Sequence, residues 1–284
     1  MDEFLRLLET ILQTFEVGQS PQAFLVLVGL AFARMLSFLV AVPFFGGAAV
    51  PARVKVATAT AFVVILYPSI AMELPEGGGP LPFGPLGFMA LLAKEAFVGY
   101  TLGFVASLVF EAVQVAGRVI DLQRGSTLDE MFAPQLQTRV SELGQFKLQL
   151  AIVLFLAIGA HHFFIGSLLR SFEVVPALNF PHLEAGWSQG AQFMARVTGG
   201  VISIGVQLAA PAMIALLLTD LFFGIVNRVA PQINVFFLSL PVKMAVGIGV
   251  VLAALPLFKD RYIYYFKESY KAFEYAIRAL AGMY

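Results

Sequence analysis

The sequence predicts an all-α integral membrane protein made of helical hairpins, with some of its helices broken. Of the 284 residues, 59% are hydrophobic and 13% are charged, whereas soluble globular chains carry roughly 25% charged residues. The mean hydropathy is +0.85. Apolar residues also gather in stretches of membrane-spanning length. Because so few charges cannot cover a soluble body of this size, the lipid membrane is the expected solvent.

Apolar stretches run along most of the chain, and most have the roughly 20 residues that a spanning helix needs. Six of them lie at residues 23–45, 54–72, 86–115, 148–169, 197–226 and 235–258, and the second is marginal in length. Helical spacing of apolar residues predicts a short amphipathic helix over residues 4–16. Residues 259–284 form a charged, Tyr-rich tail that we expect at the membrane interface. No linker divides the chain, so residues 1–284 are expected to form a single domain.

The charges between the stretches predict conflicting membrane orientations. Arg53 and Lys55 place the first link in the cytoplasm by the positive-inside rule, and acidic Glu73 and Glu76 then lie outside. Alternation through six spans would leave the C-terminus outside. The tail after residue 258, however, carries five basic and three acidic residues, which favours the inside. One stretch is therefore expected to be re-entrant or not to span.

Several functional classes are disfavoured by what the sequence lacks. The 18 basic residues balance the 18 acidic ones, so nothing indicates nucleic-acid binding. No Cys is present, which excludes disulfides and thiolate chemistry. Adjacent His161 and His162 point about 100° apart on a helix and do not predict a metal pair. An intramembrane enzyme would have only scattered carboxylates to use, so we expect no catalysis, no cofactor and no metal.

Charged residues inside the apolar stretches are the first candidates for function. Arg34 lies in the middle of the first stretch, where an Arg costs about 2.5–3.5 kcal/mol on insertion scales. It is expected to face protein or water, and a structural ion pair inside the bundle is one interpretation. Asp220, Arg228 and Lys243 lie in or near the last two stretches. They are interpreted either as structural pairs or as the ion relay of a secondary transporter or channel.

Four prolines are expected to break the last two stretches, because proline removes a backbone donor and clashes with the preceding turn. They are Pro211, Pro231, Pro241 and Pro256.

A polar stripe marks the third stretch. Five polar residues follow one another at steps of 4, 3, 4 and 3, which places them on one helix face. They are Ser107, Glu111, Gln114, Arg118 and Asp121. Arg118 and Asp121 are predicted to pair at i,i+3. Since lipid cannot receive such a stripe, it either lines a water-filled passage or packs in a polar helix–helix seam.

A second face of the same stretch carries Glu95, Gly99 and Gly103, and Gly99-x-x-x-Gly103 is a small-xxx-small site that predicts close helix packing.

Several motifs in one order resemble the FliR/SctT family, the export-gate membrane proteins of bacterial flagella and of type III secretion injectisomes. The segment Ala116-Gly-Arg-Val-Ile-Asp-Leu-Gln-Arg-Gly125, followed by Pro134, is similar to the signature loop of that family. Four further matches follow the family order. They are Pro43 with Pro51-Ala-Arg53, Lys94-Glu-Ala-Phe-Val-Gly99, Gly159-Ala-His-His162 and Ala230-Pro-Gln-Ile-Asn-Val-Phe-Phe-Leu-Ser-Leu-Pro-Val-Lys243. The resemblance covers about residues 20–258 and looks closer to the injectisome branch.

The resemblance implies a structural pore subunit of an export gate in the bacterial inner membrane, partly raised toward the periplasm. The subunit would assemble with FliP/SctR-type and FliQ/SctS-type proteins into a helical pore complex through which unfolded proteins pass. FlhB/SctU-type and FlhA/SctV-type proteins would be further partners. Residues expected to pack against other subunits are Glu95, Gly99, Gly103, Pro231, Gln232, Asn234, Pro241 and Lys243.

The polar stripe runs directly into residues 121–134, and we expect this segment to be a movable closure of the passage. The residues assigned to it are Arg118, Asp121, Gln123, Arg124, Gly125 and Pro134. Gly125 permits backbone angles that other residues avoid, and Pro134 would end a helix.

Overall fold

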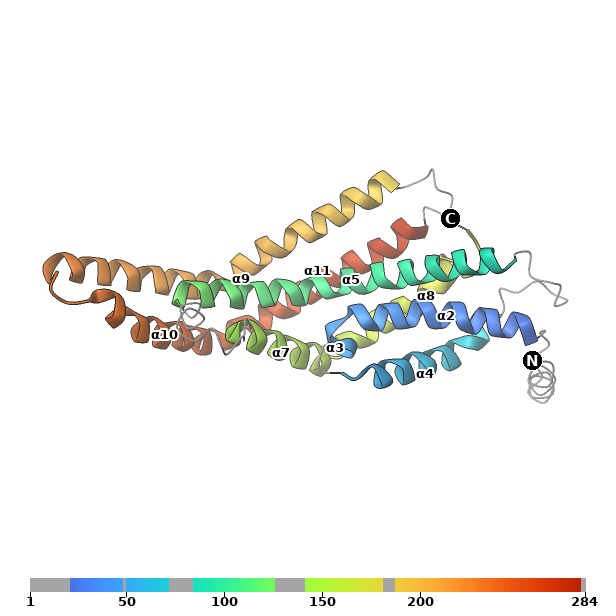
Figure 1. Cartoon of the computed structure of the whole chain (residues 1–284), viewed down its shortest axis with the longest axis horizontal. Coiled ribbons are helices and arrows are strands. Elements are labelled where there is room, and N and C mark those ends of the chain that lie inside the picture. Colours follow the sequence, from blue (N-terminus) through green and yellow to red (C-terminus); the bar gives the residue numbers. More distant parts are fainter. Residues whose placement is uncertain (1–20, 48–49, 72–83, 126–140, 181–186, 282–284) are drawn as a thin grey trace. The chain divides into compact units, whose positions relative to one another are not determined.

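The computed structural model describes residues 21–47, 50–71, 84–125, 141–180 and 187–281, and every regular element in these ranges is a helix. In chain order they are α2 (Pro21–Ala41), α3 (Pro43–Gly46), α4 (Ala52–Ala71), α5 (Pro85–Arg124), α7 (Glu142–Ala157), α8 (Ala160–Val174), α9 (Trp187–Val229), α10 (Val235–Ala253) and α11 (Leu255–Ala281) (Figure 1). The predicted all-α class is therefore confirmed. The amphipathic helix predicted over residues 4–16 lies outside the described residues.

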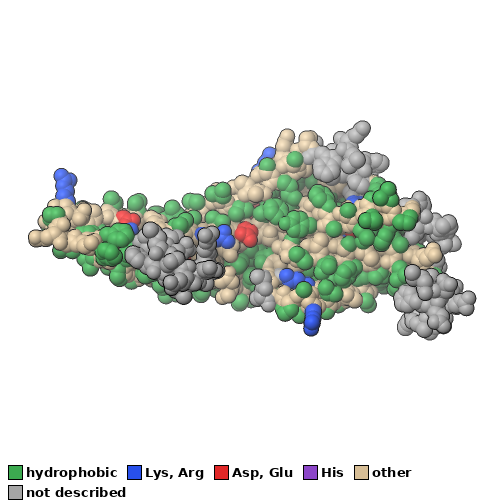
Figure 2. Space-filling view, viewed as in Figure 1, with side chains coloured by type: hydrophobic (Ala, Val, Ile, Leu, Met, Phe, Trp, Pro, Cys, Tyr) green, Lys and Arg blue, Asp and Glu red, His purple; other side chains and the backbone are tan. Residues whose placement is uncertain are grey.

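Membrane-spanning length and composition are found in four of these helices. They are α2, α5, the segment Gly190–Val229 of α9, and α10. Helices α7 and α8 make a fifth candidate when taken together, although a bend of 75° separates them. Helix α4 is not among these candidates. Figure 2 shows hydrophobic side chains spread along the visible face and few charged ones, as expected for a multi-pass membrane protein.

Local sequence explains where several of these helices begin and end. Helix α5 stops where Gly125 adopts a φ of 84°, a left-handed conformation that favours glycine. Ser141 caps α7, because its hydroxyl accepts a hydrogen bond of 2.9 Å from the Gly144 amide. The α7–α8 bend contains Gly159 with a φ of 71°. Glycine thus allows the apolar stretch 148–169 to break into two helices.

Two of the four prolines do not interrupt their helices, which corrects the sequence-based expectation. Pro211 lies inside α9 and Pro241 lies inside α10, while Pro231 falls in the turn between them. Pro256 occupies the first turn of α11, where the missing N–H has no intrahelical partner to lose. In an apolar segment a proline costs one hydrogen bond and a bend rather than the whole helix, because ending the helix would expose more backbone groups.

The chain folds into two compact units, and helices α5, α9 and α11 each contribute a segment to both. The first unit contains residues 1–107, 162–193 and 270–284, and the second contains residues 108–161 and 194–269. In the first unit the Phe273 ring lies 6.1 Å from Phe38 and 5.1 Å from Phe164. These rings join α2, α8 and the end of α11 around one aromatic core.

The second unit has an aromatic core of its own. Phe110, Phe155 and Phe266 form a triad with ring-centroid distances of 5.2, 5.6 and 5.1 Å. These side chains come from α5, α7 and α11. The apolar face of α11 is therefore buried within the chain rather than available to lipid, which leaves the interfacial position of residues 259–284 as a prediction.

Candidate functional site

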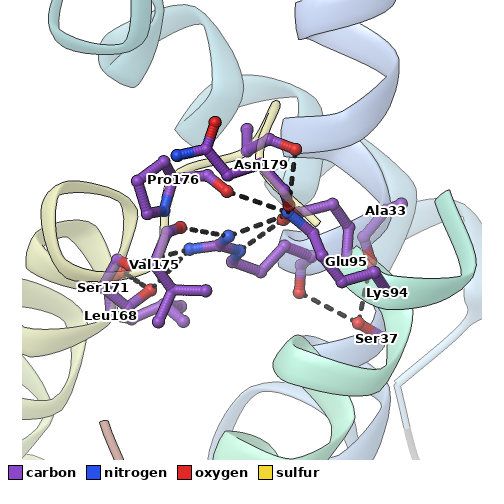
Figure 3. A network of polar contacts seen from close by, with 11 residues as sticks. Ala33, Ser37, Lys94, Glu95, Leu168, Ser171, Val175, Pro176 and Asn179 are labelled. Atoms are coloured by element: carbon purple, nitrogen blue, oxygen red, sulfur yellow. Dashed lines mark hydrogen bonds and ion pairs between the residues drawn. The ribbon is translucent and has the colours of Figure 1, made fainter. Parts of the chain in front are cut away.

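A fully buried ion pair in the first unit connects α2 to α5. Arg34 of α2 has no exposed surface, and its Nε and Nη2 atoms donate to the two carboxylate oxygens of Glu95 at 2.5 and 2.9 Å. The other donors of the guanidinium reach the end of α8: Nη1 donates to the Ser171 carbonyl at 2.9 Å, and Nη2 donates to the Val175 carbonyl at 2.8 Å. Arg34 therefore ties three segments together (Figure 3).

The guanidinium of Arg34 is further stabilised because it lies at the end of α8. The last carbonyls of a helix carry partial negative charge and lack intrahelical partners, so a cation there is stabilised. The face of the Phe172 ring also lies 4.0 Å from the guanidinium carbon of Arg34. Of the two interpretations of Arg34, a structural ion pair inside the bundle is the one that the structure contains.

Lys94, beside Glu95 on α5, occupies a cage of oxygen atoms. Its ammonium donates to the carbonyls of Pro176, Ala177 and Asn179 at 2.8, 2.8 and 3.1 Å and lies 2.7 Å from Glu95 Oε1. Two cations thus share one carboxylate, and the chain segment after α8 supplies the remaining acceptors (Figure 3). Buried charges with this many partners are stably held. We call Arg34, Lys94 and Glu95 the charged hub.

Close approach of α5 to α2 is what brings the charged hub together. A Cβ atom built on Gly99 would lie 2.1 Å from the Arg34 carbonyl oxygen, and one on Gly103 would lie 2.7 Å from the Ala41 side chain. The small-xxx-small face therefore packs closely, as its spacing predicts. Its partner is α2 of the same chain, whereas the sequence analysis assigns Glu95, Gly99 and Gly103 to contacts with other subunits.

The polar stripe of α5 is divided by burial. Ser107 is buried, and its hydroxyl donates to the carbonyl of Phe104 on its own helix at 2.8 Å. In the second unit, Glu111 and Arg118 are exposed and Gln114 is half-buried. Arg118 Nη2 donates to Gln114 Oε1 at 2.6 Å, so the stripe is partly ordered by its own bonds. These three residues, which we call the exposed stripe, leave an acid, an amide and a base uncovered on an otherwise buried helix segment.

Asp121 is buried and does not form the predicted pair with Arg118. Its carboxylate accepts from Arg124 Nη2 at 2.5 Å, from the Ser141 hydroxyl at 2.5 Å and from the Leu143 amide at 3.0 Å. The side chain of Arg118 instead reaches Gln114, because Arg118 is on the exposed side of the helix. Asp121 therefore connects the end of α5 to the start of α7. In this way it joins the two ends of the chain segment that links these helices.

Gln123 contacts a different helix from Asp121, since its Nε2 atom donates to the Met213 carbonyl of α9 at 3.2 Å. Residues 126–140, with Pro134 among them, lie outside the described residues. The movable closure assigned to residues 121–134 therefore stays a prediction. What the structure contains is its base, in which Asp121, Arg124 and Ser141 are joined by hydrogen bonds.

The α9–α10 hairpin brings together two of the intramembrane charges. Lys243 and Asp220 form an ion pair between the two helices, with side-chain exposures of 17% and 41%. Arg228 is exposed near the end of α9. Most other outward side chains of the hairpin are large and apolar, among them Leu221, Phe222, Ile225, Phe236, Phe237 and Leu238.

A polar hollow of about 520 Å³ lies at the tip of the hairpin, and Pro231, Gln232 and Asn234 are part of its lining. Together with exposed Pro241 and half-buried Lys243, these residues are the hairpin members of the set that the sequence analysis assigns to subunit packing. In the described chain most of this set remains uncovered. That exposure leaves the assignment open to a partner, and it stays a prediction.

Two features of the site are absent from the sequence analysis. The oxygen cage of Lys94 is built from backbone carbonyls, which leave no signature in the residue types. Gly117 and Gly144 mark a close approach of α5 and α7, where a Cβ on Gly117 would lie 2.3 Å from Gly144 Cα. Only the presence of glycine in each of two apolar segments could have signalled it.

Long apolar helices, a buried charged hub and an exposed polar stripe define a multi-pass helical membrane protein with a surface that lipid cannot cover. The described residues contain no group of three or more potential metal ligands. Over residues 25–269 the chain matches the family described as bacterial export proteins, family 1, and it belongs to that family. The family expected from the sequence motifs is thus confirmed.

Relatives from both branches of the family are similar to the chain. The flagellar biosynthetic protein FliR of Bacillus subtilis is 33% identical over 231 residues, which is 80% of this chain and 85% of the relative. FliR of Aquifex aeolicus is 28% identical over 92% of this chain and 97% of its own. Yop proteins translocation protein T of Yersinia pestis is 32% identical over 56% of this chain and 60% of its own. Similarity to both branches leaves the injectisome assignment as a prediction.

Proposed function

We propose that the chain is a subunit of the export apparatus of a bacterial type III secretion system and forms part of the passage for unfolded proteins. Its family and the names of its relatives support the export apparatus. Its four or five helices of spanning length support a multi-pass position, which we place in the inner membrane. The role is structural, and catalysis is not part of it.

The observation that carries the passage is the exposed stripe. In the second unit, the exposed positions of α5 include Glu111 and Arg118, with half-buried Gln114 between them. Seven residues of helix separate the acid from the base by about 10 Å. Facing lipid, such a surface would be costly, because each charge at membrane depth costs several kcal/mol. Facing water and a passing polypeptide, it offers donors and acceptors without favouring one sequence.

The outer surface of the α9–α10 hairpin supports assembly with other subunits. Large apolar side chains cover the outside of α9 and α10, while Asp220 is 41% exposed among them. A surface that is apolar but interrupted by a charge suits neighbouring helices better than lipid. We propose FliP/SctR-type and FliQ/SctS-type subunits as the neighbours, with FlhB/SctU-type and FlhA/SctV-type proteins as further partners.

A secondary transporter or ion channel is the rival function, and the contacts of its candidate residues weaken it. Asp220 and Lys243 are bonded to each other, so neither is a free relay group. A transporter would also act alone in liposomes on a small solute. An export subunit would not, and it would be isolated with partners.

Cysteine accessibility tests the passage directly, because the natural chain contains no Cys. Single Glu111→Cys and Arg118→Cys variants in the assembled apparatus should react with a charged, membrane-impermeant maleimide. Phe237→Cys on α10, where Phe237 is 58% exposed in the chain alone, is the matched control and should be protected by lipid or partners. Equal protection of all three positions would favour the alternative in which the stripe packs in a polar seam. Co-purification of partner subunits with each variant verifies assembly.

A further inference from the structure

Helix α9 bends where a proline and a buried lysine meet. The helix continues through Pro211, and Figure 1 shows its axis changing direction near the middle of its 43 residues. Proline explains the bend, because the Gln207 carbonyl loses its donor four residues later and the ring pushes the preceding turn aside. The turn 207–211 therefore has fewer internal hydrogen bonds than the rest of α9.

Lys147 of α7 reaches into this weakened turn. Its side chain has no exposed surface, and its ammonium donates to the Leu208 carbonyl at 3.3 Å. The Phe258 ring of α11 lies 4.2 Å from the same ammonium. Among the described residues no carboxylate pairs with it. A buried cation without a counter-ion is unfavourable, so Lys147 depends on the Leu208 carbonyl, which is next along the chain to the Gln207 carbonyl that Pro211 leaves without its helical donor.

A second bond at the same level ties α9 to α11. The Tyr265 hydroxyl donates to Gln207 Oε1 at 2.9 Å, one residue before Leu208. Tyr262, one turn before Phe266 on α11, is buried, and its hydroxyl finds no partner in the described part of the chain. Lys147 of α7 and Tyr265 of α11 thus both bond to the turn that Pro211 weakens.

We propose that Pro211 is a hinge of α9 and that Lys147 is the positioning residue that sets the resting angle of this hinge. The hinge divides residues 194–207 from the segment that pairs with α10. Besides the Lys147 bond, Tyr265 bonds to Gln207 and Gln123 bonds to the Met213 carbonyl. Loss of the Lys147 bond removes the contact from α7, and the bend angle of the turn should then vary more. The hinge itself is independent of the proposed function. Its use, to let the hairpin follow its neighbours in the export apparatus, rests on that function.

Distance measurements between spin labels test the hinge. Ile202 and Leu218 lie on either side of Pro211, and both are more than half exposed at 66% and 61%. Cysteines placed there in the full chain, within membrane nanodiscs, would be about 24 Å apart if α9 were straight. We expect a shorter mean distance for the natural chain. Lys147→Met should broaden the distribution about twofold, and Pro211→Ala should narrow it and move it toward the straight-helix value.

The controls separate a hinge from a general loss of structure. Lys267→Met removes an exposed lysine of α11 and should leave the distribution unchanged. Lys147→Gln keeps a neutral donor that is one bond shorter, and its distribution should lie between those of the natural chain and Lys147→Met. If Lys147→Met fails to accumulate, Pro211→Ala alone decides, because an unchanged distribution in that variant removes the hinge. Unchanged distances in a well-folded Lys147→Met variant would remove the positioning role. Neither result would alter the co-purification that tests the proposed function.

Discussion

The two units satisfy their buried polar groups to different degrees. In the first unit, Arg34 uses its guanidinium donors on Glu95, Ser171 and Val175, and Lys94 has four oxygen partners. In the second unit, several buried polar atoms find no partner among the described residues. They include Gln123 Oε1, Arg124 Nε and the hydroxyls of Tyr262 and Ser269.

Both units expose large apolar side chains, with Ile65, Leu86 and Met89 among those of the first unit. The α9–α10 hairpin of the second unit exposes many large apolar side chains together with a half-exposed ion pair. Because buried polar groups in native proteins are nearly always bonded, the unpartnered atoms of the second unit call for partners beyond the described residues, which residues 126–140, water or other chains could supply. In the first unit, by contrast, the charged hub is satisfied by described residues of the same unit.

Removing the carboxylate of the charged hub gives the largest expected effect. Glu95→Gln leaves Arg34 buried without an anion, and breaking a buried pair in this way typically costs about 3–5 kcal/mol. We expect loss of most of the protein from the membrane fraction and a clear fall in Tm. The same amide change in the second unit, Asp220→Asn, should cost far less, since Asp220 is 41% exposed.

The double variant Arg34→Leu with Glu95→Leu sharpens this test. Replacing both members of a buried pair by apolar residues is often neutral, but Lys94 then keeps only its three carbonyl acceptors. The double variant should therefore recover part of the lost protein. Equal losses for Glu95→Gln and Asp220→Asn would show that the two units do not differ in the way described.

Close packing gives the next effect. Gly99→Leu would place a Cβ 2.1 Å from the Arg34 carbonyl, which forces α5 away from α2 and strains the charged hub. Overpacking of this kind costs about 1–3 kcal/mol, while membrane insertion should persist because Leu is apolar. Gly199→Leu is the control, as nothing lies within 4 Å of its Cβ position. The yield of assembled complex, measured after mild-detergent purification, should fall for Gly99→Leu alone.

The sequence predicts the fold class and the helices of this chain well, because both depend on composition and period. Apolar stretches of spanning length, the family motifs and the shared face of Gly99 and Gly103 are visible in one dimension. The prolines are not so readable. Whether Pro211 ends a helix depends on how much free energy it costs to leave backbone groups unbonded at that place. That cost is set by the tertiary structure around the proline and cannot be read from the local sequence.

The partners of charged residues also cannot be predicted from the sequence, because tertiary structure decides which groups meet. The i,i+3 spacing of Arg118 and Asp121 predicts a pair, yet burial places Asp121 beside Arg124 and Ser141 while Arg118 stays exposed. Arg34 and Glu95 are 61 residues apart, and nothing in the local sequence of either selects the other. The carbonyl cage of Lys94 depends on backbone path alone.

A lysine substitution tests the unsatisfied core of the second unit. Lys147→Met keeps the length and apolar stem of the side chain but removes a buried cation that has one hydrogen bond of 3.3 Å. Replacement of buried charge by a well-packed apolar side chain is often stabilising, so we expect Tm to stay constant or to rise by an amount equivalent to about 1 kcal/mol. A fall as large as that of Glu95→Gln would mean that Lys147 is as well partnered as the charged hub.

Acid sensitivity gives the smallest expected effect. It tests whether a polar contact of the first unit outside the charged hub also contributes to stability. The Glu274 carboxylate of α11 accepts hydrogen bonds from the Ser167 hydroxyl and from the Tyr270 hydroxyl at 2.9 Å. The bond from Ser167 is the main cause that lowers the pKa of Glu274 below its ordinary 4.5; Tyr270, Arg170 and Arg278 also lower it, and burial opposes them. A lowered pKa means that the folded chain prefers the charged carboxylate. The stabilisation is therefore present above pH 4.5 and is lost as the pH falls through the lowered value.

Between pH 7 and pH 3, the Tm of the natural chain should fall more steeply than that of Glu274→Gln. Glu268→Gln, which changes an exposed residue of the same helix, should follow the natural chain. If the natural chain and Glu274→Gln lose Tm in parallel, the contact between α8 and α11 does not depend on this carboxylate.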